Sequence, residues 1–241
     1  MEKPKQEDVI RLLKRCAARG SRDRENAVRE LWDIAANHAG LRSLCLSGIR
    51  AAISDPEVLV RNASAEALWE VGNRNDLKRL RAAHKDEDWL VRASATEAYS
   101  RAGGKRGMPV LVKVMREDPE CVVRGCAADG IKDIGDTAGI EPLLAQLAVE
   151  SEPRTQVSIH FALVLLGCLE YAVPLARLVQ DKNWHAVCDA AMIGLEELIE
   201  KGLVVDPHAG VVKRELEAYA EDGDLIEWRQ TKALGLAARL G

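Results

Sequence analysis

The sequence predicts an all-α solenoid, in which about seven helical hairpins stack on one another. Three observations predict it. One segment pattern recurs every 31 or 32 residues, its apolar residues fall on one face of a helix, and aromatic residues are scarce. The 241 residues include Phe once, Tyr three times and Trp five times. Small and aliphatic side chains of this kind favour closely packed helices over a β-sandwich.

The clearest copies of the pattern are anchored on an arginine. Arg61, Arg92 and Arg124 stand 31 and 32 residues apart, each within a similar run of residues. The same position in the weaker copies is occupied by Arg24, Gln156, Cys188 and Arg229. The residues three, six, seven and ten positions after Arg61, Arg92 and Arg124 are small or apolar. At about 100° per residue these positions share one helical face, which excludes a strand.

A shorter helical segment precedes each anchor helix, so each repeat is predicted to be a hairpin of two helices. The expected repeats form a single domain over residues 1–241, with the ranges 6–37, 40–72, 76–103, 107–135, 139–167, 171–201 and 207–240. An acidic residue stands six positions before three of the anchor arginines, at Asp55, Asp86 and Asp118. Such a carboxylate can accept amide hydrogens in the turn and meet an arginine. We expect a structural ladder along the stack.

The pattern Asp-x-x-x-x-Val-Arg followed by a small-residue helix and a glycine resembles the HEAT-repeat superfamily. It is most similar to the short-period subgroup first noted in phycobilisome lyases. The residues that carry the resemblance are Asp55, Val60, Arg61, Ala67, Leu68 and Gly72, and the match is best over 55–135. The resemblance implies the fold. It does not select a function, because the subgroup includes bilin lyases, partners of other enzymes and proteins that hold ligands.

The charge argues against two classes of partner. A net charge of −4 gives no broad attraction for nucleic acid or for an anionic membrane. No apolar run approaches the roughly 18 residues that span a bilayer, and the N-terminus lacks the pattern of a secretion signal. A cytoplasmic location is expected. The cysteines lack zinc-site spacing and are expected to be buried thiols: Cys16, Cys45, Cys121, Cys126, Cys168 and Cys188.

Function in a solenoid is sought in residues that point away from the shared core, here one, five, eight and nine positions after the anchor. Position five places Glu66, Glu97 and Asp129 in a row on consecutive helices, and Trp69 lies beside this row. Such a row favours a basic peptide or protein segment and repels nucleic acid. The alternative is an ordinary solvated surface.

The fifth repeat is apolar at those positions, with Val157, Phe161, Val164 and Leu165. A helix that is hydrophobic all round must be covered on both sides. This pattern predicts either an exposed patch for a partner or a helix covered by the rest of the chain. Trp184 and His185 could extend the patch; alternatively, Trp184 caps the core of a degenerate repeat.

The sequence therefore predicts a non-catalytic scaffold, without cofactor or metal, that docks a protein or peptide on its concave helix surface. The alternative is a bilin-lyase-like accessory protein that holds a tetrapyrrole near Cys168 or His160. A HEAT-like DNA glycosylase is a remote alternative, because the expected groove carries acids. No histidine is followed by the glutamate with which deoxyhypusine hydroxylases bind iron on such helices. The oligomeric state is left open.

Overall fold

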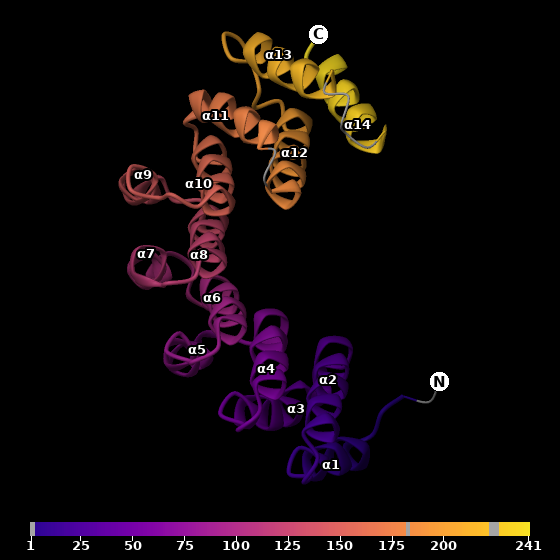
Figure 1. Cartoon of the computed structure of the whole chain (residues 1–241). Coiled ribbons are helices and arrows are strands. Elements are labelled where there is room, and N and C mark those ends of the chain that lie inside the picture. Colours follow the sequence, from indigo (N-terminus) through magenta and orange to yellow (C-terminus); the bar gives the residue numbers. More distant parts are fainter. Residues whose placement is uncertain (1–2, 182–183, 222–226) are drawn as a thin grey trace. The chain divides into compact units, whose positions relative to one another are not determined.

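The computed structural model describes residues 3–181, 184–221 and 227–241, and every regular element in these ranges is a helix (Figure 1). The α-helices are α1 (Gln6–Arg15), α2 (Ser21–Asn37), α3 (Ala39–Ala52), α4 (Val58–Val71), α5 (Leu77–Ala83), α6 (Trp89–Gly103), α7 (Met108–Glu117), α8 (Cys121–Ile134), α9 (Ile140–Leu147), α10 (Pro153–Leu165), α11 (Ala172–Arg177), α12 (His185–Glu200), α13 (Ala209–Ala220) and α14 (Glu227–Ala238). Short 3-10 helices lie beside the first helices of four repeats: η1 (Arg74–Asp76), η2 (Gly104–Gly107), η3 (Thr137–Gly139), η4 (Leu169–Tyr171) and η5 (Leu178–Gln180).

Each expected repeat contains one pair of α-helices, an odd-numbered first helix and an even-numbered second helix. The anchor is the fourth residue of the second helix in every repeat but the last, where Arg229 is the third residue of α14. The prediction of an all-α fold built from helical hairpins is confirmed. Among the described residues, none of the helices is both long and apolar enough to cross a lipid bilayer.

The chain forms two compact units, residues 1–114 (unit 1) and residues 115–241 (unit 2), and α7 spans the division. Each unit is described by itself below. That residues 1–241 form a single domain stays a prediction.

In unit 1 the second helices α2, α4 and α6 pack side by side (Figure 1). Small buried residues on α4, including Ala63, Ala65 and Ala67, let the helix axes approach closely. The helix α4 contacts α2 on one side, α6 on the other, and α3, the first helix of its own repeat. More of its surface is therefore buried than a single apolar face.

This packing corrects one expectation from the sequence. The residue directly after the anchor was expected to be exposed, but Asn62, Ala93 and Gly125 are all buried. In unit 1 the reason is contact between neighbouring second helices: the hydroxyl of Ser94 donates to Oδ1 of Asn62 at 2.8 Å. Positions five and nine do remain accessible on α4, α6 and α8.

In unit 2 the helix α10 is covered on both sides. It packs against α8 and against α11 and α12. Its residues Val157, Phe161 and Val164 belong to one core cluster with residues of α11 and α12, among them Leu175 and Leu195. The all-apolar fifth repeat is therefore explained by burial within the chain.

Candidate functional site

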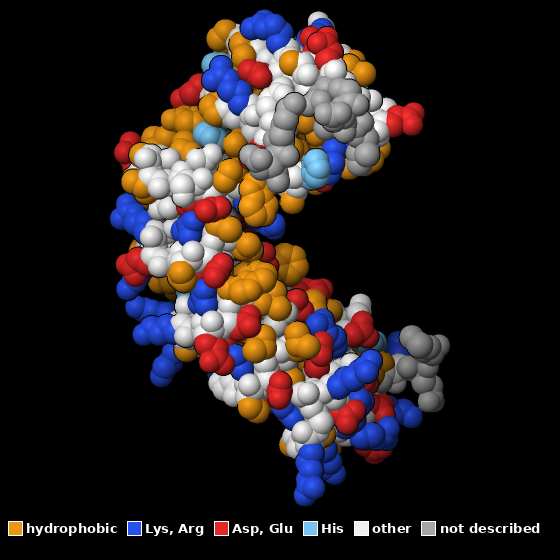
Figure 2. Space-filling view, in the orientation of Figure 1, with side chains coloured by type: hydrophobic (Ala, Val, Ile, Leu, Met, Phe, Trp, Pro, Cys, Tyr) orange, Lys and Arg blue, Asp and Glu red, His pale blue; other side chains and the backbone are white. Residues whose placement is uncertain are grey.

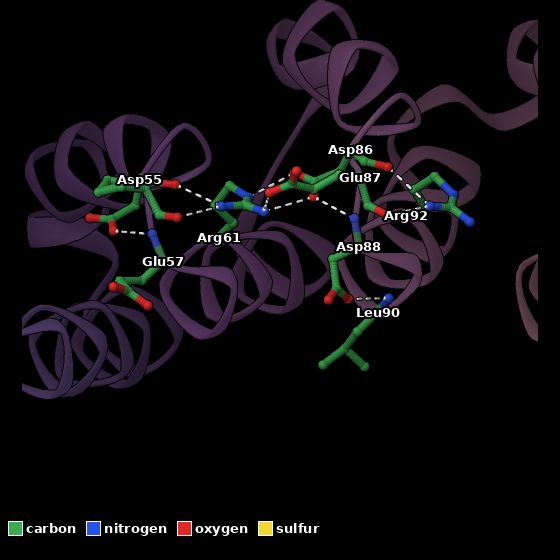
Figure 3. A network of polar contacts seen from close by, with 9 residues as sticks. Asp55, Glu57, Arg61, Asp86, Glu87, Asp88, Leu90 and Arg92 are labelled. Carbon is green, nitrogen blue, oxygen red and sulfur yellow. Dashed lines mark hydrogen bonds and ion pairs between the residues drawn. The ribbon is translucent and has the colours of Figure 1, made fainter.

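A ladder of arginine–carboxylate contacts joins successive repeats at the turns between first and second helices. Arg61 donates through Nε and Nη2 to the carboxylate of Asp86 at 2.7 and 2.8 Å, and through Nη1 to the carbonyls of Asp55 and Pro56 (Figure 3). Arg24 binds Asp55 in the same way, at 2.7 and 2.8 Å. The predicted ladder is confirmed in this unit, and the structure adds that each acid belongs to the repeat after its arginine.

The same arrangement recurs in unit 2, where Arg124 donates to Glu150 at 2.8 and 2.7 Å. Burial by itself would raise the pKa of Glu150, but hydrogen bonds from Arg124, from Gln146 and from the amide of Glu152 outweigh it and hold the pKa below its usual range. The pKa of Asp55 is lowered for the same reasons, against the effect of burial. These carboxylates are ionised and fully engaged, so the ladder holds repeats together and offers no acid or base.

The ladder changes where the anchor is not arginine. Gln156 contacts its own turn, through Nε2 to the carbonyl of Glu150 at 2.7 Å. Cys188 likewise donates through Sγ to the carbonyl of Asp181 at 2.9 Å. In the last repeat Arg229 donates backwards to Asp189 of the preceding second helix, at 2.9 Å from both nitrogens. No spacing of residues in the sequence predicts this reversal.

The second candidate site is the exposed side of α2, α4 and α6, which we call the second-helix face of unit 1. Side chains on neighbouring helices are paired across it. Trp32 donates through Nε1 to Glu70 at 2.6 Å, and the guanidinium of Arg101 lies 4.7 Å from the ring centroid of Trp69. Over α2 and α4, acidic, basic and hydrophobic side chains are interspersed (Figure 2).

Three residues predicted from the sequence lie on this face. Glu66 is half-buried and accepts hydrogen bonds from Arg29 at 3.2 Å and from Asn62 at 3.0 Å. Trp69 is 43% exposed, and Glu97 is exposed on the next second helix. The sequence missed Trp32 and Arg101 as neighbours of Trp69. The signal was present, because Trp32 and Trp69 both stand eight positions after their anchors.

The predicted site residues of unit 2 differ in how far they are exposed to solvent. The sequence left two alternatives for Val157, Phe161 and Val164. The exposed patch for a partner is wrong, and the covered helix is correct, because these residues lie in the core of unit 2. Leu165 is half-buried against the same core. Asp129 is half-buried; burial raises its pKa, although Lys132 and the hydroxyl of Ser158 favour its charged form.

On the second helices of unit 2, large apolar residues are exposed on α12, at its start and on α14, and not on α10. Trp184 is 62% exposed and His185 is exposed beside it. Ile193 is 59% exposed and Leu234 is 52% exposed. Both stand five positions after their anchors, the position that Glu66 and Glu97 occupy in unit 1. Reading position five through all the repeats would have found them.

Neither of the residues proposed for a tetrapyrrole is fully exposed. His160 is buried, stacks on Tyr171 with ring centroids 5.7 Å apart, and has its pKa lowered to about 4 by burial. Cys168 is half-buried, and burial raises the pKa of its thiol. Over the described part of the chain, no group of three or more His, Cys, Asp or Glu residues is arranged to hold a metal ion.

Comparison with known proteins identifies the repeats. Residues 46–132 match the family model described as HEAT repeats. The whole chain aligns, at 16% identity and a TM-score of 0.62, with 97% of a chain in the complex of CpcE and CpcF of phycocyanin lyase from Nostoc sp. PCC7120. A designed armadillo repeat protein aligns over 97% of this chain and all of its own, at 16% identity and a TM-score of 0.44.

An engineered protein aligns over 97% of this chain and 98% of its own, at 17% identity and a TM-score of 0.49. Among curated proteins, none is similar in sequence to the chain. Residues 46–132 are therefore similar to HEAT repeats, and the likeness of the chain to the lyase complex is a likeness of fold.

Proposed function

We propose that the chain is a non-catalytic scaffold that binds a protein or peptide partner on the second-helix face of unit 1. One observation carries the proposal: Trp69 is 43% exposed in the last turn of α4, where Leu68 and Val71 are buried. A stacked repeat has no need of an exposed indole at this position, because the core is already closed beneath it.

The indole is also held in place before any partner arrives. Arg101 of the neighbouring helix stacks on the ring of Trp69, with its guanidinium carbon 4.7 Å from the centroid. Such a contact between a cation and an aromatic face is favourable. A preordered side chain loses less conformational freedom on binding, and Trp and Arg are the residue types most enriched at the centres of protein interfaces. Trp69 with Arg101 is therefore the centre of the proposed contact.

The charges around this centre favour a basic partner. Glu66, Glu70 and Glu97 lie on α4 and α6, with Arg29 against Glu66 and Arg101 against Trp69. Charges at the edge of an interface orient the partner and raise its rate of association more than its final affinity. Trp184 and His185 are proposed as a separate contact area on unit 2, since both are exposed.

Photochemical cross-linking tests the proposal. Benzoylphenylalanine is placed at position 69 and, in a second protein, at position 149, where Val149 is 76% exposed in unit 2. Irradiation in a native cell extract is expected to give a discrete cross-linked protein from position 69 that position 149 does not give. The partner is then purified and titrated against the unmodified chain.

Two tryptophan variants complete the test with the purified partner. Trp69→Ala is expected to weaken binding by about 30-fold, equivalent to about 2 kcal/mol. Trp89→Ala is the matched control, because Trp89 is also 43% exposed in unit 1 but lies at the start of α6. Equal effects of the two substitutions, or none from Trp69→Ala, would show that the partner does not use the second-helix face.

The bilin-lyase-like role stays an alternative that rests on the repeat resemblance. A chain in the complex of CpcE and CpcF of phycocyanin lyase is similar in fold to this chain. Burial of His160 gives this chain no exposed imidazole at the place where the sequence suggested one. Mixing the protein with a bilin and recording the visible absorbance separates the two functions: a shifted band supports the alternative, and an unchanged spectrum counts against it. A cytoplasmic location remains a prediction.

A further inference from the structure

A groove in unit 1 lies on the side of the repeats where the first and second helices are joined. It is bounded by the turn that follows α3, by α5 and by the turn that follows α5, and has a volume of about 620 Å³. Ile53 and Ala83 form a buried apolar floor, with the exposed Ala82 beside them. This volume is in the range of pockets that bind small molecules or a few side chains of a peptide.

Four cations line the groove. Arg61 is paired with Asp86, whereas the charge of the other three is not neutralised within the groove. Lys78 and Lys85 are exposed, and neither makes an ion pair with any described part of the chain. Arg79 comes only within 3.8 Å of Asp76. That carboxylate is fully buried and already accepts two hydrogen bonds from Arg50, at 2.6 and 3.0 Å.

The other acid in the groove is also engaged, since Asp86 is bound by Arg61 in the ladder. The segment 74–85 contains five Lys or Arg residues and one acid, in a chain whose net charge is −4. Lys and Arg side chains gather at α5 in the space-filling view (Figure 2). The groove is therefore a local basic site on an acidic protein.

We propose that this groove binds an acidic peptide segment, which places one aliphatic side chain on Ile53 and Ala83 and its carboxylates against Lys78, Arg79 and Lys85. The apolar floor favours a peptide over a nucleic acid, because a phosphate backbone has no aliphatic group to bury there. This site is separate from the second-helix face and does not depend on the proposed function.

Fluorescence anisotropy with labelled ten-residue probes tests the proposal. The first peptide has one leucine among Asp and Glu residues, the second has serine in place of the leucine, and the third probe is oligothymidylate. The wild-type chain is expected to bind the leucine peptide at low salt. It is expected to bind the serine peptide about tenfold more weakly. Binding of both peptides is expected to weaken progressively as salt is added.

Charge reversal identifies the residues. Lys78→Glu with Lys85→Glu is expected to weaken binding of the leucine peptide by at least about tenfold. The matched control is Lys14→Glu with Arg22→Glu, which makes the same change in net charge at two exposed positions of unit 1. The control is expected to change the affinity by less than about twofold, once salt has screened the long-range charge.

A variant without a charge change tests the shape of the site. Ala82→Trp fills the groove from an exposed position, so it is expected to block the peptide while leaving the thermal unfolding of the protein unchanged. Trp69→Ala is expected to leave peptide binding intact. The proposal is overturned if the wild type does not bind the leucine peptide, if the control variant weakens binding as much as the groove variant, if Trp69→Ala abolishes binding, or if oligothymidylate binds the groove more tightly than the peptide.

Discussion

Arg61 and Asp86 are 25 residues apart in sequence, and their side chains meet through two parallel hydrogen bonds of 2.7 and 2.8 Å. The same guanidinium donates to two carbonyls of the turn that precedes its own helix. The side chain of Arg61 thereby stabilises the turn of its own hairpin and also binds the next hairpin. Both side chains are about nine-tenths buried, so water can replace neither partner easily.

Removal of this arginine is the first prediction. Arg61→Ala leaves Asp86 with a buried charge and two carbonyls without their donor, so the free energy of unfolding is expected to fall by about 2 kcal/mol. Arg61→Lys restores the charge but not the two parallel bonds, and recovers only part of the loss. Urea unfolding followed by circular dichroism measures both variants.

The control for Arg61 is a pair at the surface of the same unit. Arg15 and Glu30 are 2.8 Å apart, but their side chains are 39% and 51% exposed. Arg15→Ala is expected to change the free energy of unfolding by less than about 1 kcal/mol. A loss for Arg61→Ala no larger than this would mean that the ladder contributes nothing beyond an ordinary surface ion pair.

The second prediction concerns the glycine that ends α4. A Cβ added at Gly72 would lie 2.3 Å from the backbone oxygen of Leu68, and a backbone oxygen cannot move aside as a side chain can. Gly72→Ala is therefore expected to destabilise the protein by about 2 kcal/mol. The glycine of the repeat motif is thus required by a close approach of the chain to itself.

Gly235 provides the opposite case within α14. An added Cβ there meets nothing within 4 Å. Gly235→Ala is expected to stabilise the protein by about 0.5–1 kcal/mol, because alanine favours the helix more than glycine does. Thermal unfolding distinguishes the pair by the sign of the change. A gain from both substitutions would contradict the steric role assigned to Gly72.

The third prediction separates the buried from the exposed apolar residues of unit 2. Val164 is 0% exposed, so Val164→Asp places a charge in the core and is expected to lower the free energy of unfolding by at least about 4 kcal/mol. Phe161→Ala is expected to remove about 3 kcal/mol. Ile193→Asp changes an exposed position and is expected to alter stability by less than about 1 kcal/mol. A Val164→Asp protein as stable as the wild type would show that Val164 is not buried in the core.

The repeat pattern of the sequence is sufficient to predict the helices and the position of the anchor in each second helix, because each copy must bury the same face in the same way. It is not sufficient for the direction of the ladder. The spacing of Asp55 and Arg61 is the same whether the acid meets its own arginine or that of the preceding repeat, and only the structure shows that Asp55 meets Arg24. The pair of Arg50 and Asp76 follows no repeat and left no signal in the sequence.

The candidate site was harder to predict for a related reason. A helical wheel with one buried face places Asn62 and Phe161 outside, but a second helix in the stack also buries the flanks that touch its neighbours. Residues in those flanks look exposed from the sequence and are not. Trp69 was predicted correctly as an exposed residue, since it lies opposite both the core and the neighbouring helices.

The last prediction concerns the dependence of stability on pH. His160 is buried, and burial lowers its pKa from 6.5 to about 4. In the folded chain the imidazole is therefore neutral above about pH 4, whereas in the unfolded chain it binds a proton below pH 6.5. The free energy of unfolding is expected to fall as the pH drops from 6.5 towards 4, by about 3 kcal/mol in total from this group. Below about pH 4 both states are protonated at His160, so this group lowers the stability no further.

His160→Phe isolates this effect, because phenylalanine keeps a ring against Tyr171 and binds no proton. Carboxylates with lowered pKa values, such as Asp55 and Glu150, also make the protein less stable in acid, but they do so equally in both proteins. The difference in free energy of unfolding between the variant and the wild type is therefore expected to grow as the pH falls from 7.5 to 4.5. Urea unfolding at several pH values measures it, with His185→Gln as an exposed control. A difference that does not change with pH would mean that the imidazole of His160 reaches water in the folded protein.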